Sequence, residues 1–390
     1  MLGGWMYRLA NKHDTALPIH LQLDIERDRP LPAGGIISPL VDKFFYLAAA
    51  LMSLCVGLEL IVRHPWQAAV MNTALSHLRA RPAPRLRVFK VVGNSYKTNW
   101  PTDLFAKSAP RLRRFETTVI SPPNPNVPID ALGTIETLHL SHVQNQDLVL
   151  VLPKVFPRLR SLFMRESIIA SEEAQEAFSG SLEHIRIINR SWTTLQKILQ
   201  LFNLAAVAAV CVHPMYGLVQ FPDELSVQLS DTIELSLHAE HPRYLAQYVS
   251  GSSTIIKMRS MGVESTRTRV VELPAMSIYI GDIIRDFGPR VKFYATDQAR
   301  KPTSYCDIPD HLVVVRMPVL QQFTLCKANN AYGHEPTVTV ASGEMAGLCR
   351  ALQIGSRHVE LKLRRVELGG TELERANCFG MFGNVVYDPS

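Results

Sequence analysis

The feature that most constrains this chain is a short apolar pattern that recurs about every two dozen residues. The pattern has the form L-x-x-L-x-L, and it starts at Leu86, Leu112, Ile135, Leu159 and Leu182. Successive starts are 26, 23, 24 and 23 residues apart. A leucine-rich repeat has a period of about 20 to 29 residues and forms one short strand at this pattern. The spacing therefore predicts a stack of short parallel strands.

The segments between these patterns support the same prediction. The string APRLR stands at residues 83–87 and 109–113, and FPRLR stands at 156–160, each just before or at a pattern start. Proline disfavours helix at the residue before it, so we expect an extended approach to each strand, with the arginines solvated where the strand starts. Apolar residues at helical spacing predict short return helices. These helices are expected at residues 101–107, 146–156, 171–178 and 192–204.

The fold class predicted from these features is α/β, as an irregular leucine-rich-repeat-like solenoid (horseshoe) with a parallel concave sheet and convex helices. Residues 1–70 are expected to form an N-terminal capping region of strand and helix, because apolar and polar residues alternate from Leu17 to Ile25. Residues 71–368 are assigned to the solenoid, and residues 369–390 to a C-terminal cap or tail. The spacing is irregular between residues 262 and 318, which indicates an insertion or a degenerate unit.

A candidate binding surface follows from the strand pattern. Successive strand side chains point to opposite faces, so the middle residue of each L-x-L is expected to face outward on the concave side. These residues are Lys90, Glu116, His139, Phe163 and Arg186. Aromatic and arginine side chains are typical anchors of protein interfaces. The alternative is that each is simply a tolerated surface residue. Ser236 and Thr324 occupy the same place in less regular units.

No motif in the chain predicts catalysis, a metal or a cofactor. The sequence has no GxSxG, P-loop, HExxH or dinucleotide-binding glycine pattern. His238, Glu240 and His241 are interpreted as a solvated turn before Pro242. The net charge of +6 is small for 390 residues, and lysine and arginine are scattered rather than clustered. We therefore expect neither an enzyme nor a nucleic-acid-binding protein.

Cysteine usage and hydropathy bear on the compartment. The six cysteines form no CxxC motif, and most lie in apolar runs, so buried free thiols in the cytoplasm or nucleus are expected. The start of the chain has no signal-peptide pattern. Residues 44–62 are largely apolar and carry a single charge, Glu59. A buried helix packed against the repeats is the favoured interpretation, and a membrane-spanning helix is the alternative, which the central charge disfavours.

A resemblance adds to this picture over residues 1–190. Trp5, then LPIHLQLDI at 17–25, an apolar segment ending in His64-Pro65-Trp66 and the repeated APRLR strings together resemble fungal F-box/leucine-rich-repeat proteins. The resemblance implies that an F-box recruits a Skp-type adaptor and a cullin ubiquitin ligase while the repeats hold the substrate. The F-box would lie before Trp5, and the chain shows no LPxE-like opening. Adaptor and cullin are therefore expected partners only if an F-box lies upstream.

Three functions are consistent with these observations. The favoured one is a protein-interaction module that recognises the substrate of an F-box-like ubiquitin ligase. The second is a stand-alone leucine-rich-repeat scaffold without a link to a ligase. The third is an enzyme whose active site is assembled from distant residues.

Overall fold

The fold is seen in a computed structural model of the chain, which describes about three fifths of the sequence. The described residues are 19–25, 39–62, 67–93, 100–118, 127–142, 148–166, 182–214, 225, 229, 233–240, 253–260, 267–274, 291–297, 320–326, 338–351 and 358–388. The predicted helix at 171–178, the segment His64-Pro65-Trp66, His241 and Cys306 lie outside these ranges.

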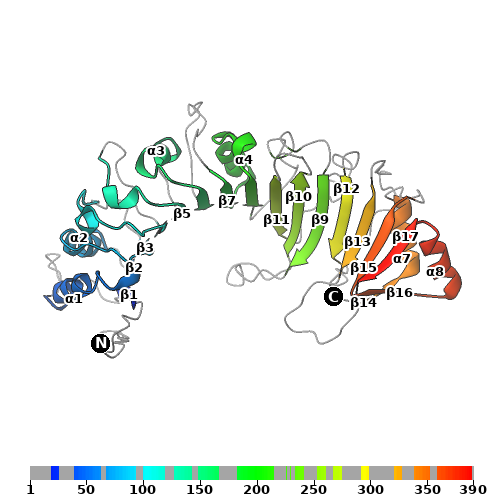
Figure 1. Cartoon of the computed structure of the whole chain (residues 1–390), viewed down its shortest axis with the longest axis horizontal. Coiled ribbons are helices and arrows are strands. Elements are labelled where there is room, and N and C mark those ends of the chain that lie inside the picture. The colour runs from blue at the N-terminus through cyan, green and yellow to red at the C-terminus, as the bar shows by residue number, and fades with distance from the viewer. Residues whose placement is uncertain are drawn as a thin grey trace. The chain divides into compact units, whose positions relative to one another are not determined.

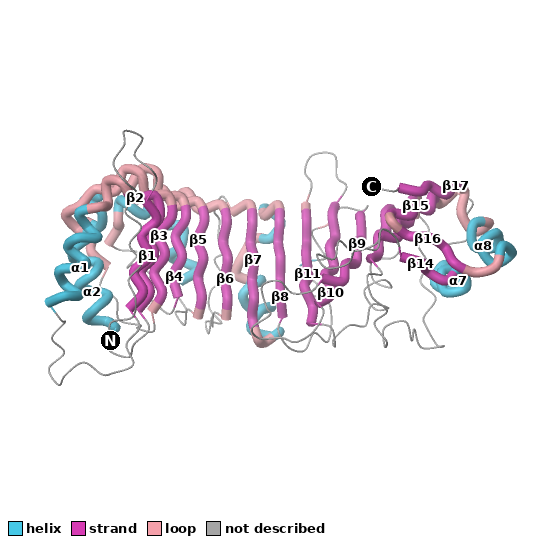
Figure 2. The backbone as a smooth tube through the Cα atoms, turned by 90° about the horizontal axis from the view of Figure 1, so that it is seen from below, coloured by secondary structure: helices cyan, strands magenta, loops and turns pink. Residues whose placement is uncertain are grey.

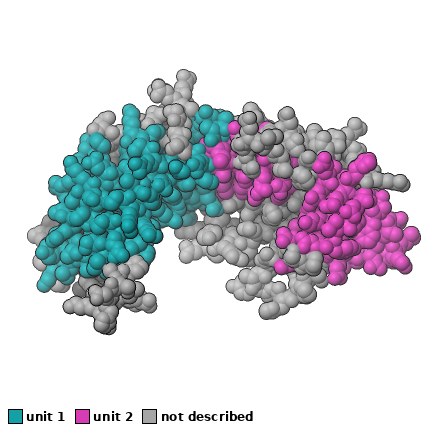
Figure 3. All heavy atoms as spheres, in the orientation of Figure 1, with its two compact units in different colours: residues 1–189, 196–206 teal, residues 190–195, 207–390 magenta. Residues whose placement is uncertain are grey.

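The chain divides into two compact units, which are described separately (Figure 3). Unit 1 comprises residues 1–189 and 196–206, and unit 2 comprises residues 190–195 and 207–390. Helix α4 (Trp192–Gln200) lies where the chain passes from unit 1 to unit 2. Both units are mixed α/β structures built on mostly parallel strands.

Unit 1 alternates strands with short helical segments (Figure 1). Its strands are β1 (Ile19–Ile25), β2 (Cys55–Val62), β3 (Val88–Val92), β4 (Arg114–Thr118), β5 (Thr137–Ser141), β6 (Ser161–Arg165) and β7 (His184–Asn189). Its helices are α1 (Pro39–Ala50), α2 (Gln67–Leu78) and α3 (Leu148–Val155), with the 3-10 helices η1 (Leu104–Lys107), η2 (Asp130–Leu132) and η3 (Leu204–Ala206). The predicted segments at 101–107, 146–156 and 192–204 thus contain helical turns.

The strands of unit 1 are paired in sequence order and are all parallel (Figure 2). Strands β3 to β7 fall at the five predicted patterns. The residues that open the patterns are at most 3% exposed, and they are Leu86, Leu112, Ile135, Leu159 and Leu182. The predicted strand near residues 17–25 is also present, as β1. The parallel strands predicted for this part of the chain are therefore confirmed.

Buried and outward side chains alternate along the strands of unit 1, and the buried ones form its core. Strands β3 to β6 show the burial pattern that a half-buried strand requires, with every second side chain inside. Phe89 and Phe115 lie opposite each other on β3 and β4, and their rings stack at 5.6 Å. Phe105 from η1 meets the edge of Phe89 at 5.3 Å, so the helical segments complete the aromatic core from one side of the sheet.

Each APRLR string forms a tight turn that starts the next strand. The amide of Leu86 donates to the carbonyl of Ala83, and that of Leu112 donates to Ala109. This places the proline at the second position of the turn, where its fixed φ is favourable. The sequence alone predicted an extended approach, and the structure adds the turn. Arg111 and Arg158 are exposed in these turns, in keeping with a solvated strand start.

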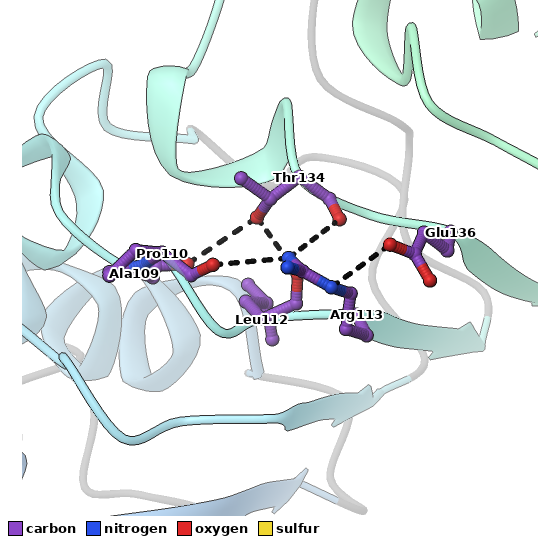
Figure 4. Close-up of polar contacts among 6 residues, drawn as sticks. All are labelled: Ala109, Pro110, Leu112, Arg113, Thr134 and Glu136. Atoms are coloured by element: carbon purple, nitrogen blue, oxygen red, sulfur yellow. Dashed lines mark hydrogen bonds and ion pairs between the residues drawn. The ribbon is translucent and has the colours of Figure 1, made fainter.

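Side chains at the strand starts bind consecutive units together (Figure 4). The hydroxyl of Thr134 donates to the carbonyl of Leu112 at 2.8 Å. Nη1 of Arg113 donates to the carbonyl of Pro110 at 3.1 Å, and its Nε lies 3.0 Å from Oε1 of Glu136 in the next unit. These contacts satisfy turn carbonyls that would otherwise depend on water.

The prediction of one helix over residues 44–62 was wrong. Helix α1 ends at Ala50, and β2 begins at Cys55. In β2, Leu58 and Leu60 are buried while Glu59 between them points to the other face and pairs with Lys90. A strand accommodates this single charge because its side chains alternate. None of the helices in the described part of the chain combines the length and hydropathy needed to cross a membrane.

Unit 2 is rich in strands. They are β8 (Ala209–Pro214), β9 (Ile233–Glu240), β10 (Ser253–Ser260), β11 (Thr268–Pro274), β12 (Val291–Asp297), β13 (Gln322–Cys326), β14 (Val338–Ala341), β15 (Glu360–Arg364), β16 (Val366–Gly369) and β17 (Asn384–Asp388). The helices whose bounds are described in this unit are α7 (Ser342–Ala351) and α8 (Glu372–Phe379). Strands β14 and β16 form a separate parallel pair.

The expectation of an entirely parallel sheet was wrong for unit 2. The strand order is β8-β11-β10-β9-β12-β13-β15-β17, and β10 is antiparallel to both of its neighbours. Strands β9, β10 and β11 form an antiparallel meander, which places β10 and β11 between β8 and β9 in the sheet. The amphipathic pattern is the same in parallel and antiparallel strands, so it does not reveal the direction.

The residues after Gly369 continue the ordered structure of unit 2. Thr371 caps α8 through a capping box, in which its hydroxyl accepts from the amide of Glu374 and the Glu374 carboxylate accepts from the amide of Thr371. Strand β17 then pairs in parallel with β15. The five cysteines in the described residues are free thiols, of which Cys55, Cys349 and Cys378 are buried and Cys211 and Cys326 are partly exposed.

Replacing a core leucine tests the inward face of unit 1. Leu138 on β5 is fully buried, so Leu138→Ala is expected to lower the free energy of unfolding by about 2 to 5 kcal/mol through lost burial and a cavity. Thr137→Ala on the adjacent, outward position is the control and is expected to cost less than about 1 kcal/mol. Chemical denaturation measures both, and equal losses would contradict the assigned faces.

A buried hydroxyl offers a stabilising substitution. Thr117 on β4 is 2% exposed, and its Oγ1 finds no hydrogen-bond partner among the described residues. Thr117→Val keeps the shape and removes an unsatisfied polar group, so we expect the free energy of unfolding to rise by about 1 kcal/mol. Thr118→Val, on the outward side, should change it by less than about 0.5 kcal/mol. A loss of stability in Thr117→Val would show that the hydroxyl is satisfied.

Candidate functional site

The five residues predicted to face outward lie side by side, one on each of the strands β3 to β7. The strand register pairs Lys90 with Glu116, Glu116 with His139, His139 with Phe163, and Phe163 with Arg186. The register between β1, β2 and β3 pairs Gln22 with Glu59 and Glu59 with Lys90, which adds two residues to the line. We call this line the polar row, and it consists of Gln22, Glu59, Lys90, Glu116, His139, Phe163 and Arg186.

The polar row lies on the face of the sheet opposite the apolar core. Phe89 and Val91, on either side of Lys90, are fully buried, whereas the Lys90 side chain is 36% exposed. The same alternation holds on β4 and β5, where Glu116 and His139 keep 20% and 27% of their side chains exposed. The buried core positions therefore determine on which face of the sheet the side chains of the polar row lie.

Ion pairs occupy the half of the row on β2 to β4. The ammonium of Lys90 pairs with the carboxylate of Glu59 on the neighbouring strand. Arg114 lies 2.6 Å from Oε1 of Glu116 on its own strand. Opposite charges directly across adjacent strands stabilise the pairing of those strands. This half of the row thus consists of charges that compensate each other.

An aromatic cluster occupies the other half, on β5 to β7. The ring of His139 lies 4.9 Å from the ring of Phe163, with an angle of 41° between their planes. The guanidinium carbon of Arg186 lies 5.8 Å from the Phe163 ring centroid, within the range of a cation–π interaction. Phe163 is therefore held between an imidazole and a guanidinium on a face that is otherwise polar.

The surroundings of His139 favour its neutral form. Burial lowers the pKa of the imidazole, and the positive charges of Arg114 and Arg186 lower it further. The Glu116 carboxylate, 3.7 Å from Nδ1, opposes the shift but does not reverse it. At neutral pH the side chain is therefore uncharged, and it can both donate and accept a hydrogen bond.

Sequence reasoning missed part of the row. Glu59 was assigned to a helix, and Gln22 was not considered as a site residue. Arg114, which pairs with Glu116 of the row, was not considered either. A detectable signal existed for Glu59, since it is the only charged residue in the otherwise apolar sequence of β2, CVGLELIV. Its pairing with Lys90 depends on the register between β2 and β3, which the sequence does not state.

The two residues proposed for the weaker units lie in unit 2. Ser236 on β9 is buried, opposite Lys257 and Ala295. Thr324 on β13 accepts a hydrogen bond from its neighbour Gln322 at 2.9 Å. Ion pairs in unit 2 lie between β9 and β10, where Arg259 is 3.3 Å from Glu234, and at the end of β17. There Asp388 lies 3.6 Å from Lys362 and 3.7 Å from Arg364.

The described residues contain no group of three or more histidine, cysteine or acidic side chains arranged to hold a metal ion. His238 and Glu240 were interpreted as parts of a turn, and this was wrong. Both lie on β9 and are paired with β10, opposite Ile255 and Ser253. The prediction failed because β9 extends to the last residue before His241.

Comparison of the chain with family models, curated proteins and solved structures found no match in any of the three. The relation to F-box/leucine-rich-repeat proteins therefore stays a prediction from the residues that suggested it.

The protonation of His139 tests the electrostatics of the row. We expect its imidazole to titrate below the ordinary value of about 6.5. The unfolded chain then binds the proton more readily than the folded one. The folded state is therefore favoured above the unfolded-state pKa, and this advantage is lost as the pH falls through the lower pKa of the folded state. Arg114→Gln is expected to raise the pKa by removing a nearby positive charge.

Nuclear magnetic resonance of the His139 ring measures this titration. Arg158→Gln serves as the control, since Arg158 is exposed in a turn at the start of β6. A His139 pKa above 6.5 in the unaltered protein, or an equal shift in both variants, would contradict the assigned environment.

Proposed function

We propose that this chain is a protein-interaction module whose partner binds the polar row of unit 1 at Lys90, Glu116, His139, Phe163 and Arg186. The observation that carries the proposal is the cluster on β5 to β7, where an aromatic ring lies beside a guanidinium on the face opposite the core. Phenylalanine on a solvent-facing strand position contributes little to folding, whereas aromatic and arginine side chains dominate binding energy at interfaces.

We further propose that the repeated units of unit 1 form an irregular leucine-rich-repeat-like solenoid, with the polar row on its concave side and the helices on its convex side. The regular turn, the parallel register and the buried pattern leucines support this assignment. Such solenoids commonly bind proteins along their concave sheet, because the in-register rows provide an extended surface.

The resemblance of residues 1–190 to fungal F-box/leucine-rich-repeat proteins favours a role as the substrate-recognition part of a ubiquitin-ligase receptor. That role requires a Skp-type adaptor and a cullin, recruited through an F-box upstream of the repeats. A stand-alone scaffold would use the same surface without them. Copurification of the adaptor with the full-length protein from its source cells supports the receptor, and partner binding without the adaptor supports the scaffold.

A photo-crosslinking amino acid placed at Phe163 tests the binding surface. Benzoylphenylalanine at this position is expected to crosslink a defined partner in an extract of the source cells, because the ring lies within the proposed interface. The crosslink should disappear when Arg186→Ala is added. The control carries the same amino acid at Tyr46, an exposed aromatic residue on α1.

Identical crosslinked products from positions 163 and 46, or none specific to position 163, would contradict the proposal. Circular dichroism of each variant shows whether the fold is retained, so that loss of the crosslink is not mistaken for unfolding.

A further inference from the structure

We propose that strand β17 of unit 2 pairs with β17 of a second copy of the chain, antiparallel and centred on Val386. This strand lies in a different unit from the polar row, so the pairing does not depend on the proposed function. Three features of β17 support it: an open edge, exposed side chains at core positions, and a sequence that matches its own reverse.

Strand β17 is the last strand of the sheet and has one open edge (Figure 2). It pairs with β15 on one side, and no strand in the described part of the chain pairs with the other. The carbonyl of Asp388 accepts a hydrogen bond from the amide of Arg365, which follows β15, so this carbonyl faces β15. Backbone groups alternate in direction along a strand, and those of Val385 and Tyr387 therefore point to the open edge. Such groups form a template for another strand.

The apolar core is incomplete at this edge. Val385 and Tyr387 lie opposite Leu361 and Leu363 of β15, on the core face of the sheet. The two leucines are at most 1% exposed, whereas Tyr387 is 56% exposed and Val385 is partly exposed. Terminal units of repeat proteins usually present a polar outer surface that closes the core. An exposed tyrosine at a core position indicates instead that a further strand fits beside β17.

The usual protection of an edge strand is missing from β17. Edge strands are commonly blocked by lysine, proline or a β-bulge. The sequence of β17 is NVVYD, which contains neither lysine nor proline, and its register with β15 is continuous. Its one charge, on Asp388, lies on the polar face near Lys362 and Arg364. The edge is therefore open to pairing.

The core face of β17 matches its own reverse. A two-fold axis perpendicular to the sheet brings two copies of this edge together with antiparallel strands and with both core faces on the same side. Centred on Val386, this axis places Val385 of each copy opposite Tyr387 of the other. Because the backbone groups of both residues point to the edge, each such pair exchanges both of its hydrogen bonds. The valine and tyrosine of one copy thus cover those of the other.

The polar face matches as well. Asn384 comes to lie opposite Asp388 of the second copy, and an amide donor opposite a carboxylate is a favourable cross-strand pair. Asn384 donates to Glu360 at 3.3 Å through a nitrogen that carries two hydrogens. A second bond, to the facing carboxylate, leaves the ion pairs of Asp388 with Lys362 and Arg364 in place.

This match favours a second copy of β17 over other strands. A strand of unrelated sequence would gain the backbone hydrogen bonds without the paired side chains. Strand β1 of a second copy would join the molecules head to tail, which gives assemblies that grow beyond two. The paired surface is only five residues long. We therefore expect a weak dimer, with an interface smaller than the standard size.

Sedimentation equilibrium of the full chain tests the inference. From low micromolar to submillimolar concentration, the mass is expected to rise from 43.7 kDa towards twice that value and no further. Val386→Glu should weaken the dimer by about tenfold or more, because two carboxylates then face each other on the axis. Within its own copy the new carboxylate lies opposite Lys362, so the fold is retained. Leu373→Glu, on an exposed position of α8, is the matched control and should leave the dimer unchanged.

Two single cysteine variants test the register directly. In Val386→Cys the two new thiols lie opposite each other in a pair without backbone hydrogen bonds, with Cα atoms about 4.5 Å apart, which suits a disulfide. Oxidation with copper phenanthroline is expected to link the copies, as seen on a non-reducing gel. In Asn384→Cys the two thiols lie about 13 Å apart along the strands and should not link. The unaltered chain gives the background from its own cysteines.

A constant mass of 43.7 kDa at all concentrations would overturn the inference. So would a mass that grows beyond the dimer, since it indicates head-to-tail pairing, or an equal loss of dimer in Leu373→Glu. Equal linking of the two cysteine variants would rule out the register centred on Val386. Circular dichroism of each variant confirms that a lost dimer or crosslink is not the result of unfolding.

Discussion

The structure of unit 1 depends on a ladder of shared backbone carbonyls at the strand starts. The carbonyl of Arg113 accepts hydrogen bonds from the amides of both Glu136 and Thr137, each at 2.9 Å. The carbonyls of Glu136 and Arg160 each accept two amides from the following unit in the same way. Each unit is thereby fixed in register on the one before it. A slip by one residue would turn every core side chain outward.

The register fixed by this ladder also creates the candidate site. Once the pattern leucines are buried in line, the side chains between them form a line on the opposite face. Contacts in the polar row join neighbouring strands, as in Glu59 with Lys90 and His139 with Phe163. The candidate site therefore needs no additional elements, because its residues lie on the same strands as the core residues and point to the opposite face of the sheet. Substitutions on this face change side chains that lie outside the core.

Unit 2 shows what happens where the repeat is interrupted. Strands β13, β15 and β16 alternate buried and outward side chains as in unit 1, but β10 runs against its neighbours and the strand order departs from the sequence order. Arg269 on β11 lies buried in this rearranged part and donates to the carbonyls of Val207 and Thr268. Burial lowers the pKa of this guanidinium to about 10, so it is still charged at neutral pH. A buried arginine thus satisfies one carbonyl just before β8 and one at the start of β11.

The sequence by itself determined the positions of β3 to β7 and the residues that face outward from them, because period and alternation are local properties of the chain. Only the tertiary structure decided that residues 55–62 form a strand, that β10 is antiparallel, and that Glu59 completes the polar row. An apolar run fits a buried helix or a buried strand equally well, and alternation is the same for both strand directions. These choices are made by hydrogen bonds and ion pairs between segments far apart in the chain, which no local pattern contains.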